Sequence, residues 1–261
     1  MSIQRISKQK LHSFKKLNLK KFREEEGTFL IEGSLGVLEA LQSDWQILSL
    51  FVTNDFLTKP TSKLFLDLAH KRNLELFEVL DVELETLTDV VTSQGIAAIA
   101  SQRIHLVDQF FTTEKSLILA LDRINDPGNL GTIIRTSDWF GVDGILTSEN
   151  SVDLYSPKVV RASMGSMFHL PIVNDVNLVI ELPKLKQQGF TILSASVGAK
   201  TTLSQIKAGA KTVIVLGSES HGISEEILSL SDTQFSIPKY GKAESLNVAI
   251  ACGVVLGTLR G

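Results

Sequence analysis

The sequence has only one cysteine, Cys252, and its five histidines do not show the spacing of metal ligands. One thiol cannot form an intrachain disulfide, and a zinc site is not expected without further cysteines, so we predict no metal. Aromatic residues make up only 7% of the chain, but hydrophobic residues make up 43%. This composition is typical of a soluble globular protein, and Cys252 is expected to be a small core residue.

The sequence also lacks a long hydrophobic run. The longest nearly apolar stretch, residues 246–259, is interrupted by Asn247, Gly253, Gly257 and Thr258. It is shorter than the ~20 residues that span a bilayer, so a buried helix is the better interpretation. The basic N-terminus is not followed by the apolar segment of a secretory signal. We therefore expect a cytoplasmic protein without a membrane partner.

Three common catalytic or nucleotide-binding motifs are missing. The chain has no Gly-x-x-x-x-Gly-Lys-Ser/Thr, no Gly-x-Gly-x-x-Gly after a strand, and no Gly-x-Ser-x-Gly. These absences argue against a P-loop nucleotidase, a conventional dinucleotide-binding oxidoreductase and a serine hydrolase.

The charge is unevenly distributed, although the net charge is only −3. Eight basic residues precede the first acidic residue, Glu24: Arg5, Lys8, Lys10, Lys15, Lys16, Lys20, Lys21 and Arg23. Such a block attracts phosphates through counterion release. A solvated helix face with long cationic side chains explains it equally well.

The apolar spacing predicts two α/β domains, residues 1–105 and 106–261, with the boundary where the pattern loosens between about 101 and 115. In the first domain we predict one helix over 8–23, another from Ser34, and others over 62–71 and 82–91. Its strands are predicted at 28–31, 47–52, 74–79 and 95–100. In the second domain we predict helices between the strands, notably over 131–140 and 223–230. Its strands, at 117–121, 144–146, 190–194, 212–216 and 234–237, are short and apolar, which predicts a mostly parallel sheet.

Three segments of the second domain follow predicted strands, where ligand sites of open α/β sheets form. In residues 125–136, a turn places Asn129 near the start of a helix and Arg135 in its second turn. A helix N-terminus and an arginine are suited to holding a phosphate or a ribose. The alternative is a surface turn followed by an arginine that extends along its helix.

The second segment, residues 213–223, passes from an apolar strand into Gly217 and Glu219. A glycine lets the backbone approach a ligand closely, and the Glu219 carboxylate is able to accept hydrogen bonds from it. Glu219 as a charge at a helix N-terminus is the alternative. In the third segment, residues 237–249, Ser245 and Asn247 fall at the start of the apolar helix, where capping alone would account for them.

In order, these segments contain NDPGNLGTIIRT (125–136), LGSESHGI (216–223) and IPKYGKAESLNV (237–248), and residues 154–168 read LYSPKVVRASMGSMF. Together they resemble the SPOUT superfamily, specifically the SpoU/TrmH RNA ribose 2′-O-methyltransferases. Lys20-x-x-Arg23, FLIEG (29–33) and Gln94-Gly95 resemble the family's RNA-binding domain of the ribosomal-protein L30e type. The chain departs from the pattern at Lys239, where the family often has methionine, and at Ala249, where serine is common.

The resemblance implies a small L30e-like α/β sandwich followed by a SPOUT domain with a mostly parallel sheet and a C-terminal trefoil knot. It also implies a homodimer that uses S-adenosylmethionine (SAM). The residues carried over to the cofactor site are Leu216, Gly217, Ile237, Ser245 and Leu246. Those carried over to the catalytic site are Asn129, Arg135, Glu219, Ser245 and Asn247. For RNA binding we expect Lys15, Lys16, Lys20, Lys21, Arg23 and Arg161.

The expected reaction is attack of a ribose oxygen on a sulfonium methyl group, with loss of the hydroxyl proton. A guanidinium essentially never deprotonates, so our hypothesis is that Arg135 holds the phosphate of the target and lowers the pKa of the hydroxyl, while another group or water takes the proton. The resemblance to rRNA-directed members favours ribosomal RNA. The alternatives are a tRNA methyltransferase, or a non-catalytic RNA-binding ribosome-assembly factor with the same fold.

Overall fold

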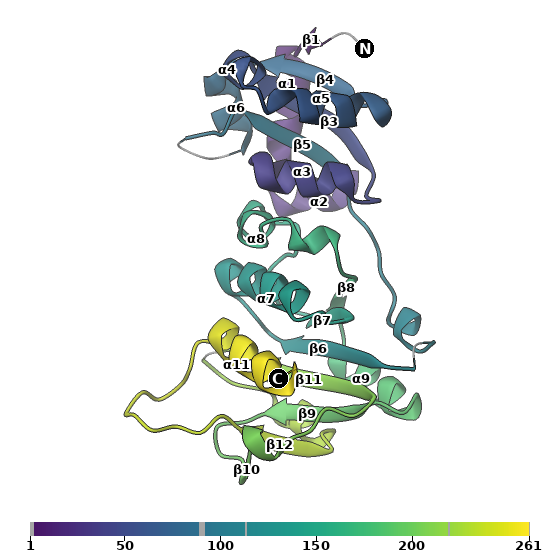
Figure 1. Ribbon diagram of the computed structural model, residues 1–261, viewed down its shortest axis with the longest axis vertical. Helices are drawn as coiled ribbons and strands as arrows, with labels where there is room; N and C mark the ends of the chain where they lie inside the picture. The colour runs from purple at the N-terminus through teal and green to yellow at the C-terminus, as the bar shows by residue number, and fades with distance from the viewer. Residues whose placement is uncertain (1–2, 89–91, 113, 219, 261) are drawn as a thin grey trace. The chain divides into compact units, whose positions relative to one another are not determined.

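The computed structural model describes residues 3–88, 92–112, 114–218 and 220–260, and it divides into two compact units (Figure 1). Unit 1 comprises Met1–Arg103 with Asp153–His169, and unit 2 comprises Ile104–Val152 with Leu170–Gly261. Residues 153–169 lie between two strands of unit 2 in the sequence, yet they pack with the N-terminal part of the chain. No helix among the described residues is long and apolar enough to cross a membrane.

Unit 1 is built around a five-stranded sheet in the order β1-β4-β3-β5-β2. Its strands are β1 (Gln4–Arg5), β2 (Thr28–Glu32), β3 (Ile47–Thr53), β4 (Glu75–Val79) and β5 (Ile96–Ser101). Strand β4 is parallel to β1 and β3, whereas β5 is antiparallel to β2 and β3. Its α-helices are α1 (Lys8–Lys15), α2 (Lys20–Glu26), α3 (Ser34–Gln42), α4 (Asn54–Thr58), α5 (Ser62–Lys71), α6 (Asp81–Thr88) and α8 (Pro157–Ala162).

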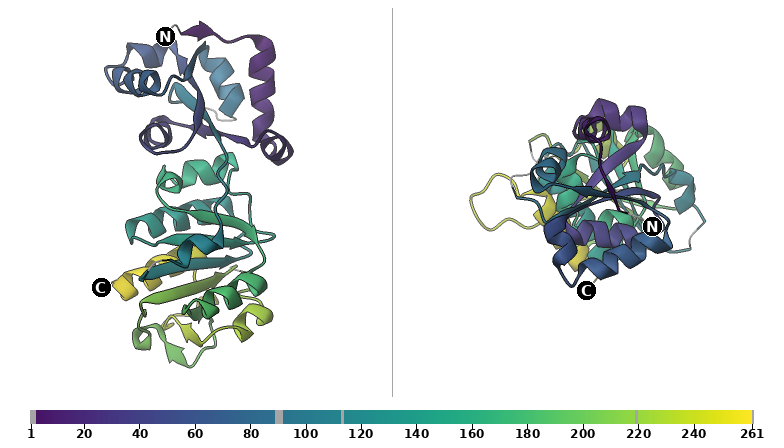
Figure 2. Two further views of the ribbon diagram at one scale, coloured as in Figure 1. Left: turned by 90° about the vertical axis from the view of Figure 1, so that its right-hand side faces the viewer. Right: turned by 90° about the horizontal axis from the view of Figure 1, so that it is seen from above.

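Helices cover both faces of this sheet, which explains why its strands are apolar on both sides. On one face, Phe51 and Ile99 join a buried cluster with Leu17 and Leu84 from the helical segments around α1 and α6. On the other face, α3 packs against β2, β5 and α5. Figure 2 shows α1 (purple) and α5 (blue) on opposite sides of the strands of unit 1. Unit 1 is therefore an α/β sandwich.

Unit 2 contains a seven-stranded sheet in the order β10-β12-β9-β11-β6-β7-β8, and all six pairings are parallel. The strands are β6 (Ser116–Asp122), β7 (Gly144–Ser148), β8 (Ile172–Val176), β9 (Thr191–Ala195), β10 (Thr201–Thr202), β11 (Lys211–Gly217) and β12 (Thr233–Ser236). The α-helices are α7 (Pro127–Trp139), α9 (Leu178–Gln187), α10 (Glu225–Ser229) and α11 (Val248–Arg260). The α/β class and the mostly parallel sheet predicted from the sequence are confirmed.

Two groups of helices enclose the sheet of unit 2. Leu182 and Leu185 of α9 and Ile227 of α10 belong to one buried cluster with alternate side chains of the central strands, including Ile118 and Val213. Helices α7 and α11 pack against one another, and α11 also contacts β11. Because both faces are covered, the two central strands, β6 and β11, are buried along almost their whole length.

The structure differs from the predicted elements at several points. The helix predicted over 8–23 is interrupted: a 3-10 turn (Lys16–Asn18) follows α1, and Leu19 is extended at φ −100° and ψ 130° before α2 begins. Of the helix predicted over 82–91, residues 82–88 lie in α6, and residues 89–91 lie outside the described residues. Helix α7 starts at Pro127, not at residue 131. Strand β8 was not predicted, and α9 is one of the helices predicted between the strands without bounds.

Candidate active site

The three motif segments meet at one edge of the sheet of unit 2. All strand pairings are parallel, so the carboxyl ends of the strands lie on the same side. Strand β6 leads to the start of α7, β11 ends at Gly217, and β12 leads into the loop 237–247 before α11. This is the edge at which open α/β sheets bind their ligands.

Asn129 and Asn247 are in direct contact at this edge. The Nδ2 of Asn247 donates to the Oδ1 of Asn129 at 3.0 Å, although 118 residues separate them. Asp126 caps α7 by accepting the amide of Asn129 at 2.8 Å, and Pro127 occupies the first turn, where its missing N–H costs nothing. The start of α7 is thus fixed by its own sequence, and that places Asn129 at the edge of the sheet.

Asn247 caps α11 with its other side-chain atom. Its Oδ1 accepts the amides of Ala249 at 3.0 Å and Ile250 at 3.2 Å. The capping alternative therefore holds for Asn247, but its amide nitrogen also binds Asn129. Ser245 does not cap the helix and lies in the exposed loop before it.

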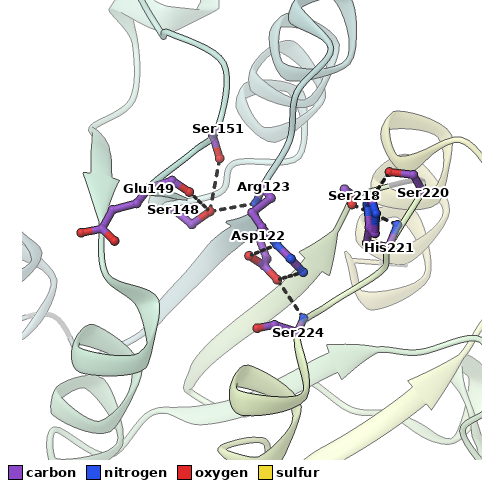
Figure 3. Close-up of polar contacts among 9 residues, drawn as sticks. All are labelled: Asp122, Arg123, Ser148, Glu149, Ser151, Ser218, Ser220, His221 and Ser224. Carbon is purple, nitrogen blue, oxygen red and sulfur yellow. Dashed lines mark hydrogen bonds and ion pairs between the residues drawn. The ribbon is translucent and has the colours of Figure 1, made fainter.

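The turn after β11 is held tightly against the strand (Figure 3). A Cβ on Gly217 would lie 2.2 Å from the carbonyl carbon of Gly222, so only glycine fits at residue 217. The amide of Gly222 donates to the Ser218 carbonyl at 2.8 Å, and Gly222 has φ +65°. Glu219, the acid expected at the tip of this turn, lies outside the described residues.

Asp122 fixes the far end of the same turn (Figure 3). It is the last residue of β6, only 3% exposed, and its Oδ2 accepts the amide of Ser224 at 2.9 Å. Both carboxylate oxygens also accept from Arg123, at 3.1 and 3.2 Å. Arg123 has φ +54°, and its amide donates to the Ser148 Oγ at 2.8 Å. An unusual backbone conformation in a non-glycine residue is retained where surrounding contacts enforce it.

The side chains of Arg135 and Asn129 in the same chain do not lie next to each other. The two residues are six positions apart on α7, which in an α-helix separates them by about 9 Å along the axis and about 120° around it. The side chain of Arg135 is exposed and makes no hydrogen bond or ion pair with any described residue. It is therefore available to a ligand.

Comparisons with known proteins match both parts of the chain. Residues 116–257 match the family model described as the SpoU rRNA methylase family, and residues 8–98 match an MRM3-like substrate binding domain. The chain belongs to the SpoU rRNA methylase family. The recognition made from the sequence motifs is confirmed, and with it the methyltransferase class and its cofactor, SAM.

Individual relatives cover the whole chain. The 23S rRNA (guanosine(2553)-2′-O)-methyltransferase RlmP of Bacillus subtilis is 31% identical over 259 residues, which are 99% of this chain and 99% of the relative. An AdoMet-bound rRNA methyltransferase from Sinorhizobium meliloti superposes with a TM-score of 0.85 at 28% identity, over 98% of this chain and 95% of the other. A putative TrmH-family RNA methyltransferase from Porphyromonas gingivalis has a TM-score of 0.82 at 29% identity, with 97% of each chain covered.

Several residues expected to bind SAM lie in or near a loop whose backbone groups are not hydrogen-bonded to the described residues. Residues 239–246 are exposed, and their backbone groups make no hydrogen bond with the described part of the chain. Leu246 in this loop is 44% exposed, whereas Leu216 at the end of β11 is buried. Free backbone donors and acceptors beside an exposed apolar side chain are suited to an adenine ring. Gly217 ends β11 and Ile237 directly follows β12, at the same edge of the sheet with β9 between the two strands, so the residues present fit SAM.

The basic residues expected to bind RNA in unit 1 divide into two groups. Lys15, Lys16, Lys20 and Lys21 are exposed. Arg23 is only 3% exposed; its Nη1 donates to the Leu17 carbonyl at 2.6 Å and its Nε to Asp153 at 3.0 Å. The Nη1 of Arg161 donates to Glu32 at 3.1 Å.

These contacts change the interpretation of Arg23. Its guanidinium lies in the interior of unit 1, so we assign it a structural role and leave it out of the RNA surface. Arg161 is half-buried in its ion pair with Glu32. Burial raises the pKa of Glu32, and the neighbouring charge of Arg161 only partly offsets that effect.

The sequence analysis missed the neighbourhood of Asp122 and Arg123. Both line an open pocket of about 240 Å³ at the carboxyl ends of β6, β7 and β8, where Ser148, Asn177 and Ser224 also contribute. None of the residues expected for catalysis or cofactor binding is among its lining residues. One signal was available: Asp122 is an acidic residue at the end of the otherwise apolar strand SLILALD.

Proposed function

We propose that this protein transfers the methyl group of SAM to a ribose 2′-hydroxyl of ribosomal RNA. The observation that carries the proposal is the contact between Asn129 and Asn247 at the sheet edge, beside the Gly217 turn and a loop with unpaired backbone. RlmP, the relative matched end to end, is named for a guanosine of 23S rRNA, which supports a guanosine in 23S rRNA as the target.

The residues of the chain have to align the ribose oxygen and manage its proton. SAM supplies an electrophilic methyl group on a positively charged sulfur. The hydrogen bond from Asn247 to the Asn129 Oδ1 fixes the orientation of both amides, because the Asn247 oxygen is used by the α11 cap. We propose that this fixed pair orients the target ribose by hydrogen bonding, and that Glu219 and Ser245 also take part in catalysis.

Arg135 has a different part in this scheme. Its guanidinium stays charged at any physiological pH, so it does not act as a base. We propose that it binds the phosphate of the target nucleotide and lowers the pKa of the hydroxyl through its charge, while water or another group accepts the proton. Its exposure and its lack of a partner among the described residues support this role.

We assign residues 1–105 to RNA binding, as an L30e-like domain, and residues 106–261 to catalysis. Lys15, Lys16, Lys20 and Lys21 are exposed and supply phosphate contacts. Lys20 and Lys21 pair with Glu24 and Glu25 at 3.5 and 3.7 Å. Exposed pairs of this kind contribute about 0–1 kcal/mol, so RNA phosphates displace them readily.

We further propose a cytoplasmic homodimer with a C-terminal trefoil knot. Helices α7 and α11 expose Trp139 (84%), Ile250 (57%) and Val254 (40%). Large apolar side chains on two packed helices support a second copy of the chain as the partner. For the knot, the support is that α11 follows β12 but packs back against β11 and α7, towards the middle of the sheet.

Methyl transfer from labelled SAM to purified rRNA and tRNA from a strain lacking this gene tests the function. We expect label in rRNA at a site resistant to alkaline cleavage, since a methylated 2′-oxygen cannot attack the neighbouring phosphate. The Arg135→Ala variant should bind SAM normally and lose the transfer. Label in tRNA alone would instead support the tRNA alternative. SAM binding without label in either pool would point to an assembly intermediate as the substrate, and absence of SAM binding to the non-catalytic factor.

A further inference from the structure

The loop between β12 and α11 is attached at its base and free at its tip. At the base, the Ser236 Oγ donates to the Ala199 carbonyl at 3.0 Å, and β12 pairs with β10. Beyond it, residues 238–246 are all exposed, and the loop extends away from the sheet in Figure 1 (yellow). The side chains of residues 238–246 make no hydrogen bond or ion pair with the described residues. Nothing in the described part of unit 2 therefore accounts for the side chains at the tip.

An aromatic ring and two cations occupy that tip. Tyr240 is 97% exposed, whereas Tyr155, the other tyrosine of the chain, is buried. Lys239 and Lys242 flank it, and both are exposed. With Glu244 counted, residues 238–246 carry two positive charges and one negative charge, so the loop is net positive in a chain of net charge −3. One exposed aromatic residue alone is ordinary on a protein surface. Its combination with two lysines that form no ion pair with the described residues suits a partner that offers both a stacking surface and negative charge.

The charges decide among the available partners. SAM carries a positive sulfonium, so two lysine side chains next to it are electrostatically unfavourable. The apolar face proposed for the second copy of the chain is on α7 and α11, where Trp139 and Ile250 are exposed. Single-stranded RNA offers both complements at once, because its bases stack on aromatic rings and its phosphates attract lysine.

The loop is also within reach of the methyl-transfer site. Tyr240 is seven positions before Asn247, and an extended chain of that length spans at most about 25 Å. Stacked nucleotides of one strand are about 3.4 Å apart, so Tyr240 lies within about seven nucleotides of a ribose held at Asn247.

We propose that Tyr240 stacks on a base of the RNA substrate near the methylated nucleotide, and that Lys239 and Lys242 hold the adjoining phosphates. The inference rests on the proposed function, since it takes RNA as the substrate. It adds a contact in the catalytic domain to those expected in unit 1, so that a nucleotide near the target is held by the same loop that leads to Asn247.

Salt-dependent binding separates the two kinds of contact. The probe is a 23S rRNA fragment that the wild-type protein methylates, and its affinity is measured between 50 and 200 mM salt. Tyr240→Ala should bind about 5- to 140-fold more weakly, with the salt dependence unchanged. Tyr240→Trp should restore binding. The double variant Lys239→Ala/Lys242→Ala should reduce the slope of log K against log salt by about 1.4, since each phosphate contact on a single strand contributes about 0.7.

Lys207→Ala is the matched control, because Lys207 is an exposed lysine of the same unit outside the loop. SAM affinity and molecular mass are measured for each variant. Tyr240→Ala with wild-type RNA affinity overturns the inference while leaving the function intact. Loss of SAM binding, or a change from dimer to monomer, also overturns it by assigning Tyr240 to the cofactor or the subunit interface. A wild-type protein that binds and methylates no RNA overturns both proposals.

Discussion

Asn247 connects the starts of two helices that are far apart in the sequence. Its Nδ2 donates at 3.0 Å to the Oδ1 of Asn129, which is the third residue of α7. Its own Oδ1 accepts the amides of Ala249 and Ile250 at the start of α11. One side chain therefore caps one helix and positions a catalytic candidate on another. Because different atoms of Asn247 make these two contacts, a substitution that removes only one of them should separate its contribution to stability from its contribution to activity.

Asn247→Asp should keep the stability of the protein and lose methyl transfer. Aspartate retains the capping oxygen but replaces the amide donor that Asn129 requires. Asn247→Ala removes both functions and should also lower the free energy of unfolding by about 1 kcal/mol. Thermal denaturation and single-turnover methyl transfer measure the two effects.

The control for Asn247 is Asn177→Ala, which removes the cap of α9 in the same unit. It should cost similar stability and leave kcat near the wild-type value. If Asn177→Ala reduced kcat as much as Asn247→Asp does, the effect at residue 247 would reflect stability alone.

Gly217→Ala should abolish SAM binding. The new Cβ would lie 2.2 Å from the carbonyl carbon of Gly222 and 2.3 Å from the backbone nitrogen of Ile223, so the turn after β11 would have to move. Gly198→Ala is the matched change, because a Cβ there meets nothing within 4 Å. Calorimetric titration with SAM should give wild-type affinity for Gly198→Ala and no detectable binding for Gly217→Ala. Equal affinities would mean that the turn is not part of the cofactor site.

The buried strands were the most predictable part of the fold. The predicted strands at 117–121 and 212–216 fall within β6 and β11, because strands buried on both faces read as continuous apolar runs. Strand β8 was missed since it contains Asn174 and Asp175, and no bounds were predicted for α9, which contains Pro183. In both segments tertiary packing overrides the local signal.

The site was predictable as a set of segments but not as a set of contacts. Motif order identified the regions around Asn129 and Asn247, while their hydrogen bond depends on the fold. The basic N-terminal block gave no indication that Arg23 is buried, because its partner Asp153 is 130 residues away. Spacing along the chain carries no information about such pairs.

Arg23→Met should destabilise the protein without changing how it binds RNA. Removing one partner of a buried ion pair leaves the other charge uncompensated, which costs about 3–5 kcal/mol. Lys20→Met, an exposed change nearby, should cost almost nothing in stability and weaken RNA binding instead. Urea denaturation and RNA titration distinguish them. If Arg23→Met weakened RNA binding at unchanged stability, while Lys20→Met lowered stability, the structural role assigned to Arg23 would be wrong.

Asp232 should make a small contribution to stability that disappears in acid. Burial raises its pKa, but the hydrogen bond from the Ile192 amide at 2.8 Å and the charge of Lys186 outweigh burial, so the pKa lies below the ordinary value of 3.8. A carboxylate whose pKa is lower in the folded state stabilises the folded protein at pH values above its unfolded-state pKa. That stabilisation is lost as the pH falls through its folded-state pKa.

Asp232→Asn keeps the oxygen acceptor and removes the charge. The variant should be less stable than wild type at pH 7 by under about 1 kcal/mol, since the pair with Lys186 is partly exposed. The difference should close as the pH falls below 3.8, the ordinary value. Denaturation curves from pH 7 to 3 measure it, with the exposed Asp67→Asn as control. A difference that grows in acid would contradict the assigned sign.

Cys252 should be unreactive in the folded protein. It is fully buried within α11, and burial raises the pKa of its thiol to about 12. Thiol reagents attack the thiolate, which is almost absent at pH 8 in such an environment, and the side chain is also inaccessible. We expect no labelling by a disulfide reagent at pH 8 in native conditions and one equivalent in denaturant.

Cys252 in the Asn247→Ala variant should be labelled faster than in wild type, because an uncapped α11 opens more often and exposes Cys252. Rapid labelling of the native wild-type protein would show that α11 is not packed as described.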